Sequence, residues 1–126
     1  MWPVARVSLT RLGSSLSAVV LDGEFDLANM QQVVDALDEA IDDDDTRAVA
    51  VDLSKVDFLD SKMLQALVGA RDRAQEALKP VWLVRPEERV WRVFQITMLD
   101  KLFRDFASME ELEDYARATE GRLSAP

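Results

Sequence analysis

The sequence predicts an α/β sandwich built on a mixed β-sheet of about five strands and about four helices, in the order ββαβαβαβα. Three observations predict it. An alternating segment at 5–10 and an apolar-rich segment at 16–21 flank a Gly13-Ser14-Ser15 turn and indicate an antiparallel hairpin. The continuous apolar runs 48–51 and 81–84 are typical of strands covered on both faces. Amphipathic segments between these runs predict crossover helices, which join parallel strands.

The N-terminal part begins with a half-buried strand, in which Ala5, Val7 and Leu9 alternate with polar residues. Residues 16–21 form the second strand, and the acidic connection 22–26 leaves the sheet. Apolar residues then recur at spacings of three and four, which predicts a helix that lies on the sheet. Its expected inner face comprises Leu27, Met30, Val34, Leu37 and Ile41.

The middle part places a buried strand at 48–51, a connection at 52–60 and a second helix from Ser61 to Leu78. Pro80 ends this helix, because proline cannot continue the helical hydrogen bonds. The expected inner face comprises Leu64, Leu67, Val68, Ala74 and Leu78. In α/β folds, functional residues gather in strand-to-helix connections. Here those connections are 22–26 and 52–61.

The C-terminal part continues with the strand 81–84 and a third helix that opens near Pro86, where a first helical turn favours proline. Val90, Val93 and Phe94 form its expected inner face. A short strand follows over 102–106. Ser108 and Glu111 have the spacing of a capping box, which predicts a fourth helix. The expected domain spans residues 1–117, followed by a flexible tail at 118–126.

The composition excludes several classes of function. The chain of 126 residues has the size of one domain. It lacks cysteine, which excludes a disulfide scaffold and a thiolate zinc site, and it lacks histidine, which excludes a Ser-His-Asp triad. A net charge of -9 argues against nucleic acid and anionic membranes as partners. No signal peptide or membrane span is recognised, so the expected compartment is the cytoplasm.

Ser61 is the principal candidate site residue, because it lies where the second helix begins. A helix N-terminus offers unpaired amides and a partial positive charge, which suit a phosphate. A phosphoserine there adds about -1.5 to -2 charge beside Asp60, with Asp57 and Asp26 expected nearby. Such a charge would eject a docked acidic or apolar partner surface. The alternative is structural: Asp60 or Ser61 is an ordinary helix cap, which contributes about 1 kcal/mol.

Three blocks of the chain resemble the signature of STAS domains, which occur in sulfate transporters and in anti-sigma factor antagonists. The blocks follow one another in the family's order, and the predicted elements lie between them. They comprise Gly23-Glu24-Phe25-Asp26; Asp52-Leu53-Ser54 with Val56, Phe58, Leu59-Asp60-Ser61 and Leu64; and Val90-Trp91-Arg92-Val93-Phe94 with Thr97, Leu99-Asp100 and Leu102-Phe103. The resemblance covers residues 5 to 117 and implies a STAS-like sandwich.

The resemblance implies a stand-alone bacterial anti-sigma factor antagonist. In that branch, the serine matching Ser61 is phosphorylated by an anti-sigma factor that is itself a serine kinase. The unphosphorylated form binds that anti-sigma factor and frees the sigma factor, and a metal-dependent protein serine phosphatase resets the switch. Asp26 matches a family aspartate beside the serine. Asp26 and Asp60 are expected to shape its surroundings, while Lys62, Met63 and Leu64 begin the partner-facing helix.

The chain departs from the family where Met63 and Met98 replace glycines. Glycine permits a close backbone approach or a left-handed φ, which a methionine does not readily adopt. Two interpretations stay open. The methionines record drift in a member that no longer meets a kinase, or they enlarge an apolar partner-binding patch, because methionine suits adaptable interfaces.

Two alternatives belong to other functional classes. The chain could be a STAS scaffold subunit of a signalling or transport assembly that is never phosphorylated. Asp26, Asp52, Asp57 and Asp60 could also bind magnesium for phosphoryl transfer, but the chain has no phosphate-binding glycine loop. The acidic run 42–45 is typical of a solvated loop. We therefore expect a protein-binding module and not an enzyme, with no catalytic residue, cofactor or metal.

Overall fold

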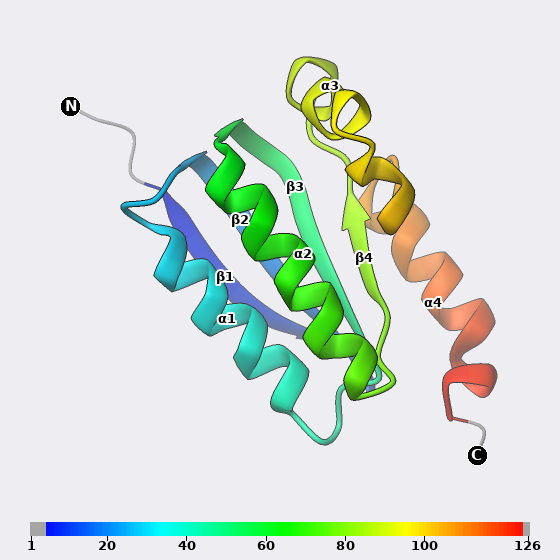
Figure 1. Cartoon of the computed structure of the whole chain (residues 1–126). Helices are drawn as coiled ribbons and strands as arrows, with labels where there is room; N and C mark the ends of the chain where they lie inside the picture. Colours follow the sequence, from blue (N-terminus) through cyan, green and yellow to red (C-terminus); the bar gives the residue numbers. More distant parts are fainter. Residues whose placement is uncertain (1–4, 125–126) are drawn as a thin grey trace.

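The computed structural model describes the backbone of residues 5–124 and the side chains of residues 5–119 (Figure 1). Five strands form one sheet in the order β1-β2-β3-β4-β5. The β1–β2 pair is antiparallel and the other three pairs are parallel, so the sheet is mixed as predicted. The strands are β1 (Arg6–Leu12), β2 (Leu16–Phe25), β3 (Ala48–Leu59), β4 (Val81–Val84) and β5 (Arg104–Phe106).

Four α-helices connect or follow these strands, which confirms the predicted order ββαβαβαβα. They are α1 (Met30–Asp42), α2 (Ser61–Glu76), α3 (Glu88–Ile96) and α4 (Met109–Ser124), and a short 3-10 helix, η1 (Leu99–Leu102), follows α3. Helices α1 and α2 lie together over one face of the sheet, and α4 lies on the opposite side (Figure 1).

Each face of the sheet has its own hydrophobic core. The larger core packs α1, α2 and α3 against the sheet, and Phe25, Leu37, Leu67 and Phe94 are among its buried side chains. The smaller core lies on the other face, where α4 inserts Leu112 among residues of β2, β3 and β4. Alternate residues of β3 serve the two cores, which explains why its sequence 48–51 is continuously apolar.

Strands β2 and β3 both extend beyond their predicted ends, and the expected connection 52–60 is largely strand. Pairing continues to Phe25 opposite Leu59 and is interrupted by two irregularities in register. In this extension the buried residues are Leu53, Val56 and Leu59, which recur every third position. Bulges break the two-residue alternation of a regular strand. The prediction of a loop was therefore wrong.

Three apolar residues expected to face the core are exposed. Leu27 precedes α1 and does not belong to it, and Leu78 lies beyond the last turn of α2 with a φ of 61°. Val93 is exposed on α3, where Trp91 is buried instead. Val90 and Phe94 are buried as predicted, so the prediction for the third helix is wrong only at Val93.

Helix α4 begins at the predicted capping box. The Ser108 hydroxyl accepts a hydrogen bond from the Glu111 amide at 3.2 Å, and the Glu111 carboxylate accepts one from the Ala107 amide at 3.1 Å. The helix then continues to Ser124, past Arg117, where the sequence predicts a tail to begin. Helical backbone thus crosses the predicted boundary between domain and tail, and the flexibility of 118–126 stays a prediction.

Candidate functional site

Two connections meet at the end of the sheet where β2 and β3 finish. The Asp60 amide donates a hydrogen bond to the Phe25 carbonyl at 3.1 Å. Asp26 directly follows the acceptor, and Ser61 directly follows the donor. We call the surface formed by residues 24–29 and 57–62 the Ser61 edge. The fold thus brings Asp26, Asp60 and Ser61 together from segments far apart in the sequence.

Asp60 caps helix α2. Its backbone is extended, and its carboxylate accepts a hydrogen bond from the Met63 amide at 2.9 Å. The Leu64 amide donates to the Asp60 carbonyl. Within the described part of the chain, the amides of Ser61 and Lys62 have no acceptor, as expected for the first turn of a helix. These two amides are available to an anion at this position.

The Ser61 side chain is exposed at the start of α2. Among residues 5–124, no group forms a hydrogen bond with its hydroxyl. Lys62 is exposed beside it. An accessible hydroxyl at a helix N-terminus can accept a phosphoryl group, because the helix end stabilises the added negative charge.

Asp26 is held in place by its own connection. Its amide donates to the Asn29 side-chain carbonyl at 3.0 Å, and its carboxylate accepts from the Ala28 amide at 2.9 Å. The Asn29 side chain also donates to the Glu24 carbonyl at 2.9 Å. Asp26 remains exposed, so its carboxylate adds negative charge to the Ser61 edge. Asn29 was not among the predicted site residues; the bond from the Ala28 amide to Asp26 is the turn that an aspartate signals in a sequence, but the contact with Asn29 has no such signal.

Met63 and Leu64 do not lie on the surface of the protein. Met63 is completely buried and Leu64 nearly so, both in the core beneath α2. The expectation that these side chains form part of an exposed binding surface is wrong. They begin the helical stripe that continues with Leu67, Ala70 and Ala74, which lies against the sheet.

Met98 occupies the position where the family has a second glycine, and its backbone is left-handed with a φ of 62°. This is the conformation that a glycine at this position would allow. The Met98 side chain is exposed. Of the two methionines, only Met98 is therefore on the surface.

The acidic residues considered for magnesium binding do not converge. Asp52 lies within β3, opposite Val20 and Val84, where its carboxylate accepts hydrogen bonds from the Ser54 amide and hydroxyl at 2.9 and 2.7 Å. Among the described residues, no three acidic side chains are grouped to hold a metal ion. None of the described helices combines the length and the apolar character needed to cross a membrane.

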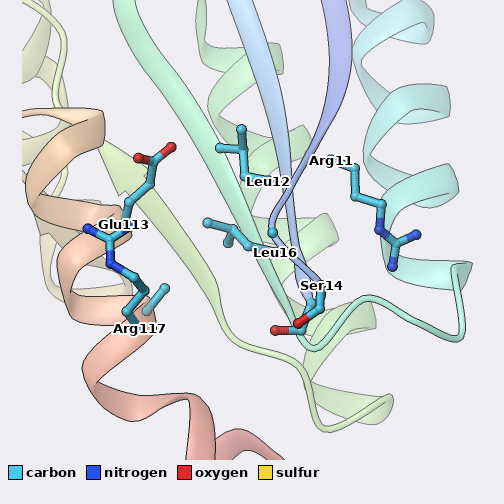
Figure 2. A pocket seen from close by; sticks show the side chains of 9 residues that line it. Arg11, Leu12, Ser14, Leu16, Glu113 and Arg117 are labelled. Carbon is cyan, nitrogen blue, oxygen red and sulfur yellow. The ribbon is translucent and has the colours of Figure 1, made fainter.

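A pocket of about 430 Å³ lies between the β1–β2 turn and α4 (Figure 2). Leu12 and Leu16 face it from the hairpin, and Glu113 and Arg117 border it from α4. The Arg11 side chain points away from it, toward Asp43, with which it forms an ion pair at 2.8 Å. The turn joins β1 and β2 at the end opposite Phe25, so this pocket is separate from the Ser61 edge.

Comparison with known protein families identifies the fold. The family model described as "Mlab, STAS domain" matches residues 8–107. The chain belongs to this STAS family. The predicted resemblance is therefore confirmed over most of the chain.

Solved structures of several bacterial regulatory proteins have the same architecture. An anti-sigma factor antagonist from Mycobacterium paratuberculosis is 22% identical with a TM-score of 0.80, over 90% of this chain and 95% of that chain. SpoIIAA in its unphosphorylated form is 22% identical with a TM-score of 0.77, over 90% and 97%. A putative anti-sigma factor antagonist from Thermotoga maritima is 20% identical with a TM-score of 0.79, over 88% and 94%. At these identities, the likeness shows the fold.

Proposed function

We propose that this chain is an anti-sigma factor antagonist controlled by phosphorylation of Ser61. The unphosphorylated form binds an anti-sigma factor that is a serine kinase, and this binding frees the sigma factor. The accessible Ser61 hydroxyl, which has no hydrogen-bond partner within the described residues at the capped start of α2, carries the proposal. We expect this role in the cytoplasm, as a protein-binding module and not an enzyme.

The chemistry of the proposed switch is a reversible phosphoryl transfer. The kinase moves the γ-phosphoryl group of ATP to Ser61 Oγ, so a P–O bond to Oγ forms, the hydroxyl proton leaves and ADP is released. A protein serine phosphatase then transfers the phosphoryl group to water. This chain supplies the acceptor hydroxyl and the helix end that stabilises the charged product.

The surroundings of Ser61 explain how one phosphate would end binding. Leu27 and Phe58 expose apolar side chains on the Ser61 edge, and Asp26 and Asp60 supply negative charge. A docked partner would bury this edge. A phosphate adds about -1.5 to -2 charge there, and burying an unpaired charge is costly. The partner therefore dissociates, while the helix end keeps the phosphorylated chain folded.

The first test is mass spectrometry of the protein isolated from its native cells, both intact and as peptides. One phosphate on Ser61 supports the switch. Ser61 found unmodified in stressed and unstressed cells alike, in a chain that co-purifies with a stable partner, would instead favour the STAS scaffold subunit.

The second test measures affinity for the cognate anti-sigma factor. Ser61→Asp should weaken binding, and Ser61→Ala should bind like the wild type but accept no phosphate. Ser8→Asp is the matched control. Ser8 is exposed in the middle of β1, so its replacement adds the same charge away from the Ser61 edge. Equal affinity of Ser61→Asp and wild type would contradict the proposal.

A further inference from the structure

Exposed apolar side chains gather on α3 and the turn that follows it. Val93, Ile96, Met98 and Leu102 are all exposed, with Ile96 at 74% and Met98 at 59%. We call these four residues, with Arg92 and Lys101, the α3–η1 surface. Single exposed apolar residues are normal, but a group of large ones on neighbouring elements marks an interaction site. The core beneath α3 is already filled by Val90, Trp91 and Phe94.

The turn that carries this surface is held in an unfavourable conformation. Met98 has a φ of 62°, although it is not a glycine. Within the described residues, Asp100 Oδ1 is buried without a hydrogen-bond partner. Strained backbone is typical of binding and switch segments, where the position of a side chain matters more than stability. Here the strained residue also exposes a large apolar side chain.

The α3–η1 surface presents two cationic side chains next to its apolar residues, although Glu88 and Asp100 belong to the same elements. The net charge is -9, yet Arg92 and Lys101 are exposed beside the apolar residues. Neither forms an ion pair with another described side chain, whereas Arg89 on the same helix contacts the Glu87 carboxylate at 2.5 Å. Arg92 and Ile96 are four residues apart and share one face of α3. This surface therefore suits aliphatic side chains bordered by carboxylates.

The α3–η1 surface adjoins the Ser61 edge. Arg89 donates a hydrogen bond to the Asp57 carbonyl at 2.9 Å, which joins α3 to the end of β3. Figure 1 shows α3 at the end of the sheet where β3 finishes and α2 begins. One protein docked at Ser61 can therefore reach α3 without covering the rest of the molecule.

We propose that the α3–η1 surface is the second half of the docking surface, and that it binds an acidic aliphatic patch on the same anti-sigma factor. The inference rests on the proposed function and adds a contact that phosphorylation does not touch. The Ser61 edge makes binding switchable, and the α3–η1 surface selects the partner by its charge. A second copy of this chain, or an anionic membrane, is the competing occupant.

The first experiment maps the contacts in the native cells by photo-crosslinking. A photo-reactive benzoylphenylalanine replaces Ile96, Lys62 or Leu78 in the full chain. Leu78 is the control, because it is 90% exposed but follows the C-terminal end of α2, away from the Ser61 edge. The proposal expects one and the same kinase-type anti-sigma factor, identified by mass spectrometry, at positions 62 and 96, and not at 78.

The second experiment measures affinity for that purified anti-sigma factor. Met98→Gly removes the side chain and also relieves the left-handed backbone, so weaker binding cannot be attributed to unfolding. We expect at least about a fivefold rise in Kd with no fall in the thermal midpoint. Leu78→Gly relieves the same strain elsewhere and should leave Kd unchanged. Arg92→Glu should raise Kd and reduce its dependence on salt.

The outcomes separate this inference from the proposed function. The proposed role of the α3–η1 surface is wrong if the anti-sigma factor crosslinks at 62 but not at 96, or if Met98→Gly binds with wild-type affinity. Either result is compatible with the proposed phosphorylation switch at Ser61. A crosslink at 96 to a second copy of this chain, or to lipid, overturns it in favour of that occupant. No anti-sigma factor at 62, with Ser61→Asp behaving as wild type, overturns the proposed function itself.

Discussion

The Asp60 carboxylate accepts the Met63 amide at 2.9 Å and so caps the helix that begins with Ser61. Replacing Asp60 with alanine should lower the free energy of unfolding by about 1 kcal/mol, because one amide loses its acceptor. Asp60→Asn should retain most of this stability, since asparagine also caps helices. Urea denaturation measures both. Asp57→Ala is the control, because Asp57 is exposed and only its backbone carbonyl is used. An equal loss in Asp57→Ala would contradict the capping role.

Ser17 and Thr46 share a hydrogen bond of 2.6 Å between hydroxyl oxygens, and both residues are buried. Thr46→Val should destabilise the fold by about 1–3 kcal/mol, because it leaves the Ser17 hydroxyl buried without a partner. The double variant Ser17→Ala with Thr46→Val should lose less than the sum of the two single losses. A double-mutant cycle from denaturant curves measures this coupling, and strict additivity would show that the hydroxyls act independently.

Met63 is a core residue, and its replacement should affect stability more than binding. Met63→Ala should cost about 2–5 kcal/mol through lost burial and a residual cavity. Met63→Leu preserves the volume and should cost less than about 1.5 kcal/mol. Unfolding curves give these values, and the affinity of Met63→Leu for the anti-sigma factor should match the wild type. If a stably folded Met63→Leu variant bound more weakly, Met63 would contribute to partner binding, and the assignment to the core alone would be wrong.

Leu78 offers a route to higher stability. Its φ is 61°, and its side chain is exposed to solvent and does not pack in the core. A non-glycine residue in the left-handed conformation destabilises the fold by about 1–2 kcal/mol. Glycine removes this strain, but it also destabilises the fold by about 0.5–1 kcal/mol, because it has more entropy to lose from the unfolded chain. Leu78→Gly should therefore gain about 0.5–1 kcal/mol. Leu78→Ala tests the cause, because it removes the side chain but keeps the strain and should bring no such gain.

The sequence predicted the order of the elements because periodicity and turn residues record it directly. Strand ends were less predictable. Polar residues such as Ser54 and Lys55 looked like loop, but they belong to a bulged strand in which every third residue is buried. A search for two-residue alternation does not detect that pattern. The register with β2 that holds this strand arises from long-range pairing, which no local pattern contains.

The candidate site also has features that the sequence predicts and features that it does not. The position of Ser61 at a helix start was predictable, because an aspartate precedes an apolar helical stripe. The burial of Met63 could also be predicted, since Met63 lies four residues before Leu67 on the stripe that faces the sheet. In contrast, the bond from Arg89 to Asp57 spans 32 residues and has no local signal. Helix α3 therefore joined the site only once the structure was known.

The two hydrophobic cores differ in size, which implies that the molecule does not unfold locally as a single unit. Helix α4 is held by the smaller core alone, whereas α2 belongs to the larger one. Hydrogen exchange should therefore release the amides of α4 at a lower opening free energy than those of α2. Since the Ser61 edge is built on the larger core, a chain with α4 transiently detached would keep its switch intact. Phosphorylation of Ser61 and the local opening of α4 would then be thermodynamically independent.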